Sequence, residues 1–387
     1  MTFVSLEMLA WMAGTVALFR LAPNGLRHPV LAGITLAFLV VHAPGSVLPL
    51  VLFTVATYGL PRLGRGSTAA LLVAGALVGG VLLAFKAGLA APAGGSARLV
   101  MPLGLSYYAL RCLHYLIESY KGRLPPHGFG EFAGYLFFLP TLVAGPIHRF
   151  PDYLRDRRDP RRGAAALSRG LERILYGYVH IVVFGNWLVS LKLRGLVDSL
   201  GPERARLAEY LDCLRFGANV YFQFAGYSSI AIGFALLLGF RVIENFNWPF
   251  LARNIADFWR RWHISLSSWC RDYVYMPVVA LTRDVSLAAL ASMLVLALWH
   301  ELSPRYVAWG LYHGLGVVAW QGFQKARRRL PPVRSEAGRA VALALSVAVT
   351  ANFVILSFAI TKEPSLREAV RVYVLILFGV KPDVFLP

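Results

Sequence analysis

The sequence has few charged residues, and this shortage excludes most classes of soluble protein. Only 15% of its 387 residues are Asp, Glu, Lys or Arg, whereas 57% are hydrophobic. A soluble domain carries roughly 25% charged residues, so this chain has too few of them to cover a surface in water. The high apolar content also excludes intrinsic disorder. We therefore predict an all-α polytopic membrane protein.

The charge that is present is mostly positive, with a net charge of +19. Such a balance can indicate nucleic-acid binding, but here the basic residues form short clusters between long apolar runs, and no nucleic-acid partner is expected. The two strongest clusters are Arg149–Arg173 and Lys325–Arg339. The positive-inside rule places both on the cytoplasmic side of the inner membrane. They act as a topology signal alone, or also as a docking surface for an acidic partner or for phosphates.

Cysteine is nearly absent. The three cysteines, Cys112, Cys213 and Cys270, lie far apart in or beside apolar stretches and form no CxxC pair. This spacing excludes a disulfide scaffold in practice, and we expect three small buried side chains.

Standard catalytic motifs are missing too. The sequence contains neither GxxxxGKS/T nor GxGxxG, so nothing indicates ATP or dinucleotide binding. The stretch from Gly226 to Ile230 has the first glycine and the serine of a GxSxG elbow but ends in isoleucine. His300 and Glu301 begin like the HExxH zinc motif, but Pro304 occupies the position of the second histidine. A zinc protease is therefore excluded, and no metal site is expected.

Apolar stretches recur along the whole chain and predict about ten or eleven membrane spans. In Met1–Arg20 the acid, Glu7, comes early and the basic residue comes last, which indicates a retained first helix rather than a signal peptide. Several stretches are short or broken by Gly and Pro, so they need a protein bundle or a water-filled cavity around them. The other stretches are Pro29–Val41, Val47–Leu60, Ala69–Phe85, Val100–Ile117, Phe132–Ile147, Ile174–Leu193, Ala218–Phe240, Val285–Trp299, Tyr306–Phe323, Ala340–Ile360 and Ala369–Val380.

One segment, Glu244–Ala280, mixes arginine and aspartate with four tryptophans and does not fit a simple span. Tryptophan favours the membrane interface, where its ring is apolar and its N–H stays wet. Trp259, Trp262 and Trp269 recur near helical spacing. We therefore expect an amphipathic helix in the cytoplasmic interface, or a re-entrant element.

Nine histidines are the main candidates for proton transfer. His263, His300 and His313 stand out, because His300 ends a long apolar run and His313 lies within the next one. An ionisable group at membrane depth is costly and indicates function. Burial favours the neutral imidazole that a general base needs, so His300 is predicted to take a proton from a hydroxyl in a water-restricted site. The others are expected to be structural: His28, His42, His114, His127, His148 and His180.

Five segments carry a resemblance to a known family: Met101–Gly122, Phe137–Arg149, Tyr221–Phe250, Asp257–Met276 (DFWRRWHISLSSWCRDYVYM) and Leu298–Gly314 (LWHELSPRYVAWGLYHG). Together they resemble the membrane-bound O-acyltransferase family, and most closely its bacterial branch, which holds the alginate O-acetylation membrane subunit and the teichoic-acid D-alanyl transfer protein. The match runs in order over about Met101–Gln324, whereas the first hundred residues match only as apolar spans.

The resemblance implies the fold and its division. The whole chain, 1–387, would form one membrane-embedded domain, with N-terminal spans at 1–100, a motif-bearing core at 101–324 and C-terminal spans at 325–387. Transmembrane and re-entrant or interfacial helices would form a ring around a central tunnel.

It also implies an enzyme with His300 as the catalytic histidine and His263 as the second motif histidine. An acyl group, acetyl before others, would pass from a cytoplasmic thioester to a hydroxyl of an extracytoplasmic polysaccharide or cell-envelope glycan. The donor would be acyl-CoA or an acidic acyl carrier protein. The transfer is downhill, so no tightly bound cofactor is expected. Expected partners are the lipid bilayer, the donor and an extracytoplasmic acyltransferase- or esterase-like protein.

Five further residues of the motif segments are predicted to bind substrate: Arg260, Arg261, Trp299, Tyr312 and Asn247. Arg260 and Arg261 pair with a donor phosphate or anchor the segment to anionic lipid. Trp299 and Tyr312 are expected to line the cavity. Asn247, with its neighbour Asn245, is expected to bond broken backbone at the re-entrant turn.

Some alternatives stay open at this point. His263 either orients the thioester arm or caps a helix. The sequence departs from the family pattern at Gln223, Ser229 and Glu301, which leaves the histidine pair intact but puts the substrate of the bacterial branch in doubt. D-alanyl or other acyl transfer from a carrier protein to an envelope polymer or lipid is the alternative enzyme. A lipid or polysaccharide transporter is the alternative class, although the paired interrupted segments of transporters are not seen.

Overall fold

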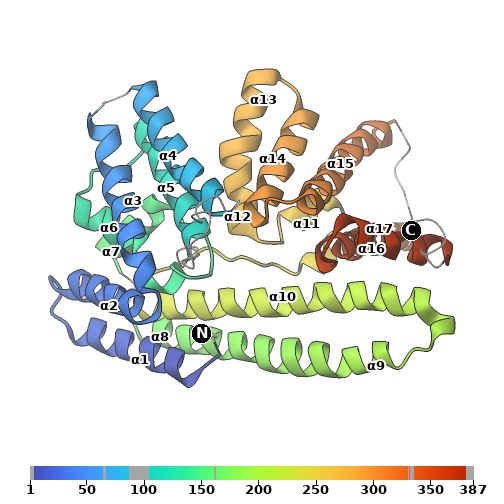
Figure 1. Ribbon diagram of the computed structural model, residues 1–387, viewed down its shortest axis with the longest axis horizontal. Coiled ribbons are helices and arrows are strands. Elements are labelled where there is room, and N and C mark those ends of the chain that lie inside the picture. Colours follow the sequence, from blue (N-terminus) through green and yellow to red (C-terminus); the bar gives the residue numbers. More distant parts are fainter. Residues whose placement is uncertain are drawn as a thin grey trace, which may run out of the picture. The chain divides into compact units, whose positions relative to one another are not determined.

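The computed structural model describes residues 4–63, 67–86, 104–160, 163–329, 331 and 335–380 (Figure 1). Within these residues every regular element is helical, apart from one isolated bridge between Phe246 and Trp262. The predicted all-α class is therefore confirmed. Some residues named in the sequence analysis lie outside the described residues. They are the start of the first motif segment, Met101–Leu103, and the basic residues Arg161, Arg162 and Arg334.

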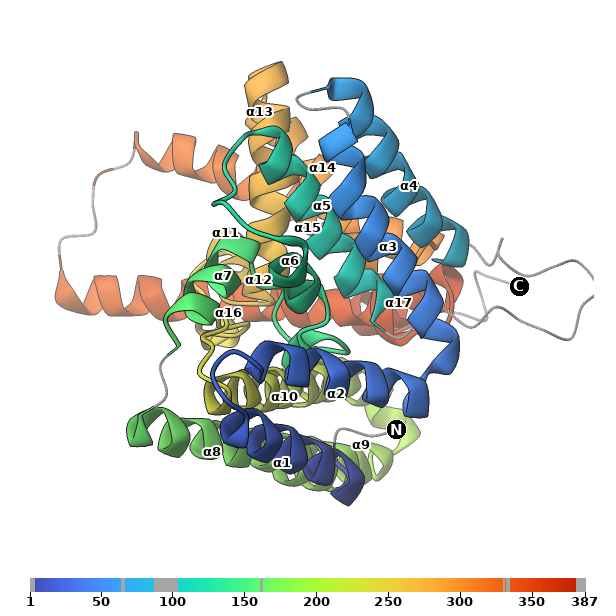
Figure 2. The same ribbon diagram turned by 90° about the vertical axis from the view of Figure 1, so that its left-hand side faces the viewer.

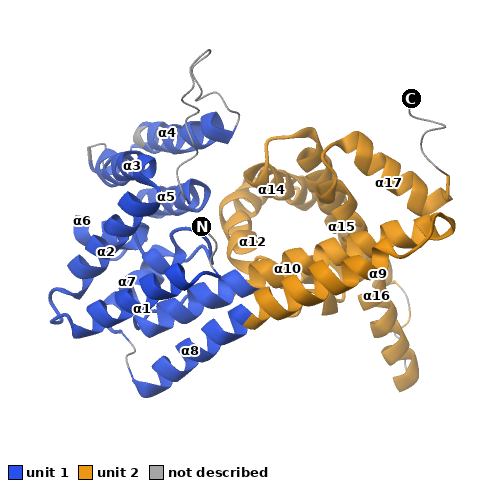
Figure 3. Ribbon diagram, turned by 60° about the horizontal axis from the view of Figure 1, so that its bottom comes forward, with its two compact units in different colours: residues 1–178, 226–243 blue, residues 179–225, 244–387 orange. Residues whose placement is uncertain are grey.

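The chain forms two compact units, coloured separately in Figure 3. Unit 1 comprises residues 1–178 and 226–243, and unit 2 comprises residues 179–225 and 244–387. The expected single domain with divisions at 100 and 324 stays a prediction. The third expected segment, 325–387, falls wholly within unit 2.

Unit 1 holds the N-terminal helices together with the end of α10. Helices α3, α4 and α5 lie side by side in it (Figures 1 and 2). Its elements are α1 (Leu6–Leu21), α2 (Arg27–His42), α3 (Pro44–Leu63), α4 (Thr68–Lys86), α5 (Leu105–Tyr120), α6 (Phe129–Leu136), η1 (Leu139–Thr141), α7 (Phe150–Arg158) and α8 (Ala164–Tyr178).

Unit 2 holds the histidine-bearing motifs. Its elements are η2 (Val179–Leu193), α9 (Arg194–Asp198), η3 (Pro202–Arg204), most of α10 (Ala205–Leu237), η4 (Pro249–Leu251), α11 (Ile255–Trp259), α12 (Ile264–Cys270), η5 (Arg271–Tyr275), α13 (Met276–Thr282), α14 (Val285–His300), α15 (Pro304–Arg327), α16 (Glu336–Lys362) and α17 (Leu366–Phe378).

Four helical stretches in the described part of the chain are long and apolar enough to cross a membrane. They are Pro44–Arg62, Ala164–Asp198, Pro202–Leu237 and Glu336–Lys362, and three shorter apolar helices accompany them. The polytopic prediction is confirmed. However, these four stretches are fewer than the ten or eleven membrane spans that were expected. Two expected spans, Ile174–Leu193 and Ala218–Phe240, belong to longer continuous helices. Whether the helices form a ring around a tunnel stays a prediction.

A buried arginine organises the core of unit 1. Arg111 on α5 is 1% exposed, and its guanidinium donates to the carbonyl oxygens of Tyr135 at 3.1 Å and Thr141 at 2.7 Å. A buried cation is tolerated only when such partners replace its water. These bonds tie α5 to the end of α6 and to η1.

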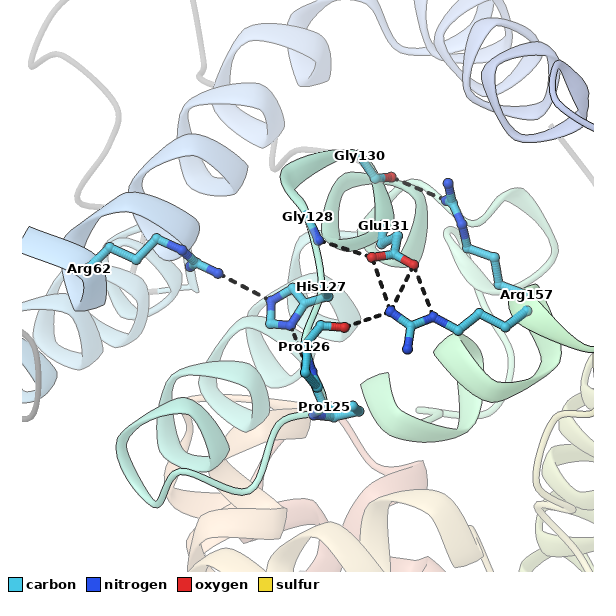
Figure 4. A network of polar contacts seen from close by, with 9 residues as sticks. Arg62, Pro125, Pro126, His127, Gly128, Gly130, Glu131 and Arg157 are labelled. Atoms are coloured by element: carbon cyan, nitrogen blue, oxygen red, sulfur yellow. Dashed lines mark hydrogen bonds and ion pairs between the residues drawn. The ribbon is translucent and has the colours of Figure 1, made fainter.

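The first basic cluster, Arg149–Arg173, is partly neutralised within unit 1. Arg158 forms an ion pair with Glu131 at 3.1 Å and donates to the Pro126 carbonyl. Arg157 donates to the Gly130 carbonyl (Figure 4). Nearby, His127 accepts from Arg62 at 3.3 Å. Part of this cluster therefore holds α7 against the start of α6, which leaves fewer of its charges available for docking.

Close helix packing in unit 2 depends on glycine. A Cβ atom on Gly310 of α15 would lie 2.8 Å from the Cβ of Ala297 and 3.1 Å from the Met293 carbonyl on α14. Gly314, one turn further along α15, also faces α14, since a Cβ atom there would lie 3.3 Å from the Leu290 Cα. These contacts fix the distance between the helix that ends at His300 and the helix that begins at Pro304.

Candidate active site

A cavity of about 160 Å³ in unit 2 brings the motif histidines together. His263, His300 and His313 all line it, although they come from the loop before α12, the end of α14 and the middle of α15. The other lining residues are Phe216, Val220, Phe224, Phe258, Trp259, Trp262, Tyr306, Trp309, Val354, Ser357, Phe358 and Thr361. The walls are thus mostly aromatic and apolar, with the histidines as their principal ionisable groups.

Glu244–Ala280, expected to form an amphipathic interfacial helix or a re-entrant element, is not one continuous helix, and a re-entrant element stays a prediction. The segment is divided into η4, α11, α12, η5 and α13, and the helical path breaks at His263. His263 has φ +44°, in the left-handed region that residues other than glycine rarely adopt. Trp259, Trp262 and Trp269 are at most 8% exposed, so they pack inside unit 2.

The unusual backbone at His263 is held by hydrogen bonds from the two residues that follow it. The Asn245 side chain, which is fully buried, accepts from the Ser265 amide at 3.3 Å and from its hydroxyl at 2.7 Å. The Ile264 amide donates to the Asn245 carbonyl at 3.0 Å. The expected role of Asn245 in satisfying broken backbone is confirmed.

The backbone of His263, rather than its side chain, caps α12. Its carbonyl accepts from Leu266 at 3.0 Å and Ser267 at 2.9 Å, and its imidazole makes no capping bond. Of the two roles left open for this side chain, helix capping is excluded. The side chain is instead available to the cavity that it lines.

His263 and His300 form a close pair, with ring centroids 6.3 Å apart. His263 is 2% exposed, and its Nε2 has no hydrogen-bond partner among the described residues. Burial lowers the pKa of His263 well below its ordinary value, and the neighbouring His300 lowers this pKa further. His263 is therefore neutral at pH 7 and carries a lone pair.

His300 differs from the burial expected for it. It is exposed, at the last position of α14, although it lines the cavity. Its ring stacks on Tyr306 with centroids 6.0 Å apart and meets Trp309 edge-on at 6.0 Å. The predicted burial is instead found at His263 and His313, because α14 ends at His300 and the chain turns there into α15.

Glu301, which follows His300, is engaged in an ion pair. Arg305 donates to both of its carboxylate oxygens, at 3.2 and 2.6 Å, and also donates to the Glu363 carbonyl at the end of α16. Glu301, at which the sequence departs from the family pattern, thus joins the turn after His300 to α15 and, through Arg305, to the end of α16.

Two predicted cavity residues lie outside the cavity wall. Tyr312 stacks on Phe353 at 4.3 Å and donates its hydroxyl to the Phe353 carbonyl at 2.9 Å, so it packs α15 against α16. Trp299 is not a lining residue either, but its ring contacts His300 at 4.9 Å and His263 at 5.9 Å. The prediction that both line the cavity is corrected, because α14 and α15 present other faces to it.

Arg261 and Asn247 have structural partners. Arg261 pairs with Asp257 at 3.0 Å and donates to the Asn247 carbonyl at 3.3 Å, and the Asn247 amide donates to the Arg261 carbonyl at 2.9 Å. Burial favours a raised pKa for Asp257, but hydrogen bonds from Arg253 and Arg261 hold that pKa below its usual range. Only the backbone of Asn247 takes part in this pairing, and binding of substrate by its exposed side chain stays a prediction.

Arg260 lies at a second and larger cavity, of about 550 Å³. Its side chain is 72% exposed and lies 3.7 Å from Asp257. Arg271 lines the same cavity, whose inner wall includes Ser292, Met293 and Leu296 of α14. Trp259 lines both cavities.

Several lining residues were missed from the sequence. Tyr306 and Trp309 lie inside the quoted motif Leu298–Gly314, so their closeness to His300 could have identified them. Val354, Ser357 and Phe358 of α16 carry no such signal, because an apolar helix does not reveal which face packs beside a distant histidine. No group of three or more His, Cys, Asp or Glu side chains is placed to hold a metal ion within the described ranges.

An all-α polytopic membrane protein with a histidine pair in an aromatic cavity is the class that fold and site define. The chain belongs to the membrane-bound O-acyltransferase family, whose model matches residues 97–360. It is 32% identical over 281 residues to the protein named probable alginate O-acetylase AlgI of Pseudomonas aeruginosa, covering 71% of this chain and 51% of that protein.

Two further relatives act on other envelope polymers by their names. The teichoic acid D-alanyltransferase of Streptococcus thermophilus is 31% identical over 287 residues, which is 69% of each chain. The peptidoglycan O-acetyltransferase of Helicobacter pylori is 25% identical over 310 residues, covering 71% of this chain and 56% of that protein. The chain spans about half the length of the alginate relatives that it matches.

Proposed function

We propose that this protein transfers an acetyl group from a cytoplasmic thioester to a hydroxyl of a cell-envelope polysaccharide. The observation that carries the proposal is the pair of His263 and His300 on one aromatic cavity, with ring centroids 6.3 Å apart. Family membership supports the reaction type. The names of the relatives support an envelope polymer as acceptor, since alginate, teichoic acid and peptidoglycan all occur among them.

In the proposed reaction His300 is the general base. It removes the proton from the acceptor hydroxyl, whose oxygen attacks the acyl carbon; the new C–O bond forms as the C–S bond breaks. The proton on His300 then passes to the leaving thiolate, so the products are an ester and a free thiol. His263 positions the reacting groups as a neutral imidazole, and the aromatic cavity orients the two substrates.

The donor is proposed to reach the site from the larger cavity. Arg260 and Arg271 line this cavity, and guanidinium groups match the geometry of phosphate oxygens. Both coenzyme A and a carrier's phosphopantetheine arm carry phosphate. The competing role for Arg260 is anchoring to anionic lipid. Measuring binding of the donor in the absence of lipid phosphate distinguishes donor binding from lipid anchoring.

Three features of the proposal concern the whole protein. It lies in the inner membrane with its basic clusters on the cytoplasmic side, and its helices form a ring around a tunnel that admits donor and acceptor from opposite sides. An extracytoplasmic acyltransferase- or esterase-like protein is its proposed partner.

The test is acyl transfer by the purified protein in lipid nanodiscs, with radiolabelled acetyl-CoA or acetyl carrier protein as donor. General-base catalysis contributes about 10²–10⁴-fold, so His300→Ala should lose transfer by that factor while it stays folded. His42→Asn is the matched control, because His42 lies in α2 of unit 1. Transfer at the wild-type rate by a monodisperse His300→Ala protein would refute the assignment.

The same assay decides the alternative acyl group. D-alanyl carrier protein replaces the acetyl donor, with teichoic acid as acceptor. Transfer of D-alanine alone would move the protein to the reaction named for its Streptococcus relative.

A further inference from the structure

Besides His263, three lining side chains of the histidine cavity have buried polar atoms without a partner among the described residues. They are Trp259 of α11 and Trp309 and His313 of α15. The indole Nε1 of each tryptophan and both ring nitrogens of His313 make no hydrogen bond to any described residue. His313 is 1% exposed, and the two tryptophans are 8% exposed.

The three rings form one cluster beside His300. The His313 ring lies 4.8 Å from Trp309 and 5.2 Å from Trp259, and the two indoles contact each other edge-on at 5.8 Å. Trp309 also meets His300 at 6.0 Å. Trp309 therefore contacts the ring of the proposed base, and the rings of Trp259 and His313 both contact Trp309.

Leaving these atoms unpaired is costly. Each buried polar group without a partner costs about 1–3 kcal/mol, and native proteins contain few of them. Other histidines of the described residues leave at most one buried ring nitrogen unpaired, as His148 does at Nε2 while its Nδ1 bonds the Thr141 hydroxyl, whereas His313 leaves both unpaired. Four unpaired nitrogens in one cluster on a cavity wall point to a ligand that supplies their partners.

The chemistry of the cluster selects the kind of ligand group. An indole N–H only donates, and a neutral imidazole donates from one nitrogen. The cluster thus offers three N–H donors and a single acceptor. A hydroxyl that is to be deprotonated needs an acceptor, which His300 supplies, whereas a carbonyl oxygen accepts through two lone pairs and donates nothing.

We propose that Trp259, Trp309 and His313 form the subsite that binds the carbonyl oxygen of the acyl thioester. This subsite rests on the proposed acyl transfer and names the residues that recognise its donor. Trp259 also lines the larger cavity, so the subsite lies where the two cavities share a wall residue. During attack the carbonyl oxygen gains negative charge, and N–H donors in aromatic surroundings stabilise it more strongly than water-exposed donors do.

The test uses two phosphopantetheine analogues that cannot be cleaved. In both, a methylene replaces the thioester sulfur; one keeps the carbonyl as a methyl ketone, and in the other a methylene replaces that carbonyl. Phosphopantetheine is common to coenzyme A and carrier proteins, so the probe suits either donor. Binding of each analogue to the wild-type protein in nanodiscs is measured by calorimetry.

The wild-type protein should bind the ketone at least about tenfold more tightly than the alkane, because the alkane leaves the donors unpaired. Trp309→Phe and Trp259→Phe should each reduce this ratio several-fold by weakening binding of the ketone alone, and His313→Gln provides a third variant. The matched control is Trp269→Phe, because Trp269 is a buried tryptophan that lines neither cavity. In the acyl-transfer assay Trp309→Phe should lower kcat by about 10²–10³-fold.

Equal binding of the two analogues by the wild-type protein, or failure of both to bind, would overturn the subsite. So would an unchanged ratio in folded Trp309→Phe and His313→Gln proteins. These outcomes leave acyl transfer itself untouched. A wild-type protein that transfers no acyl group from any thioester refutes the proposed function instead, and binding of the analogues still reports on the subsite separately.

Discussion

At the scale of single residues, His263 shows how backbone geometry creates the site. Its left-handed conformation ends the helical path after Trp259 and allows a new helix to begin at Ile264. Such a conformation costs about 1–3 kcal/mol and persists only where surrounding bonds enforce it. Here the buried Asn245 supplies those bonds. The strain therefore serves to place a buried, neutral imidazole beside His300.

The burial of His263 predicts a dependence of stability on pH. Its folded-state pKa lies below its unfolded value of about 6.5, so the unfolded chain binds the proton first and stability falls as pH drops below about 6.5. His263→Asn removes this titration and keeps a residue that tolerates the left-handed region. Its melting temperature should fall less steeply than that of the wild type between pH 6.5 and 5.

One titrating group changes the free energy of unfolding by at most about 1.4 kcal/mol per pH unit. Above pH 7.5 the difference between the two proteins should be constant, because His263 is neutral in both folded and unfolded states there. Identical pH profiles for the two proteins below pH 6.5 would contradict the burial and neutrality of His263.

At the scale of elements, the α14–α15 hairpin positions the catalytic residues. Helix α14 carries His300 at its end, and α15 carries Tyr306, Trp309 and His313 on the side that lines the cavity. Gly310 allows the two helices to approach closely. The Glu301–Arg305 pair then joins the turn between them to the end of α16. The cavity thus depends on helix separation as well as on the residues that line it.

Gly310→Ala should destabilise the protein and lower acyl transfer. The new Cβ atom would lie 2.8 Å from the Cβ of Ala297, so the helices must separate, and overpacking of this kind costs about 1–3 kcal/mol. Gly322→Ala on the same helix is the matched control, because a Cβ there meets nothing within 4 Å. Thermal unfolding and transfer rates of both variants provide the measurement. Equal effects of the two substitutions would show that the close contact at Gly310 is unimportant.

At the scale of the whole molecule, charge distribution predicts the orientation in the membrane. The basic clusters Arg149–Arg173 and Lys325–Arg339 should both face the cytoplasm. In a variant whose three buried native cysteines are replaced, Asp159→Cys and Arg328→Cys introduce single labels in these clusters. An impermeant maleimide should label neither site in intact cells and both after permeabilisation. Labelling of either site from outside would overturn the proposed topology and with it the side of donor entry.

The sequence by itself determined the membrane class, the helical composition and the motif pair of His263 and His300. These features depend on composition and on residues close together in the chain, which can be read locally. The tertiary structure decided which side chains share the cavity. It brought α16 beside motifs some fifty residues earlier, turned Tyr312 toward Phe353 and enclosed Trp259, Trp309 and His313 without partners. Such contacts depend on which helix faces pack together, and an apolar helix in a membrane protein carries too little periodicity to show its packed face in advance.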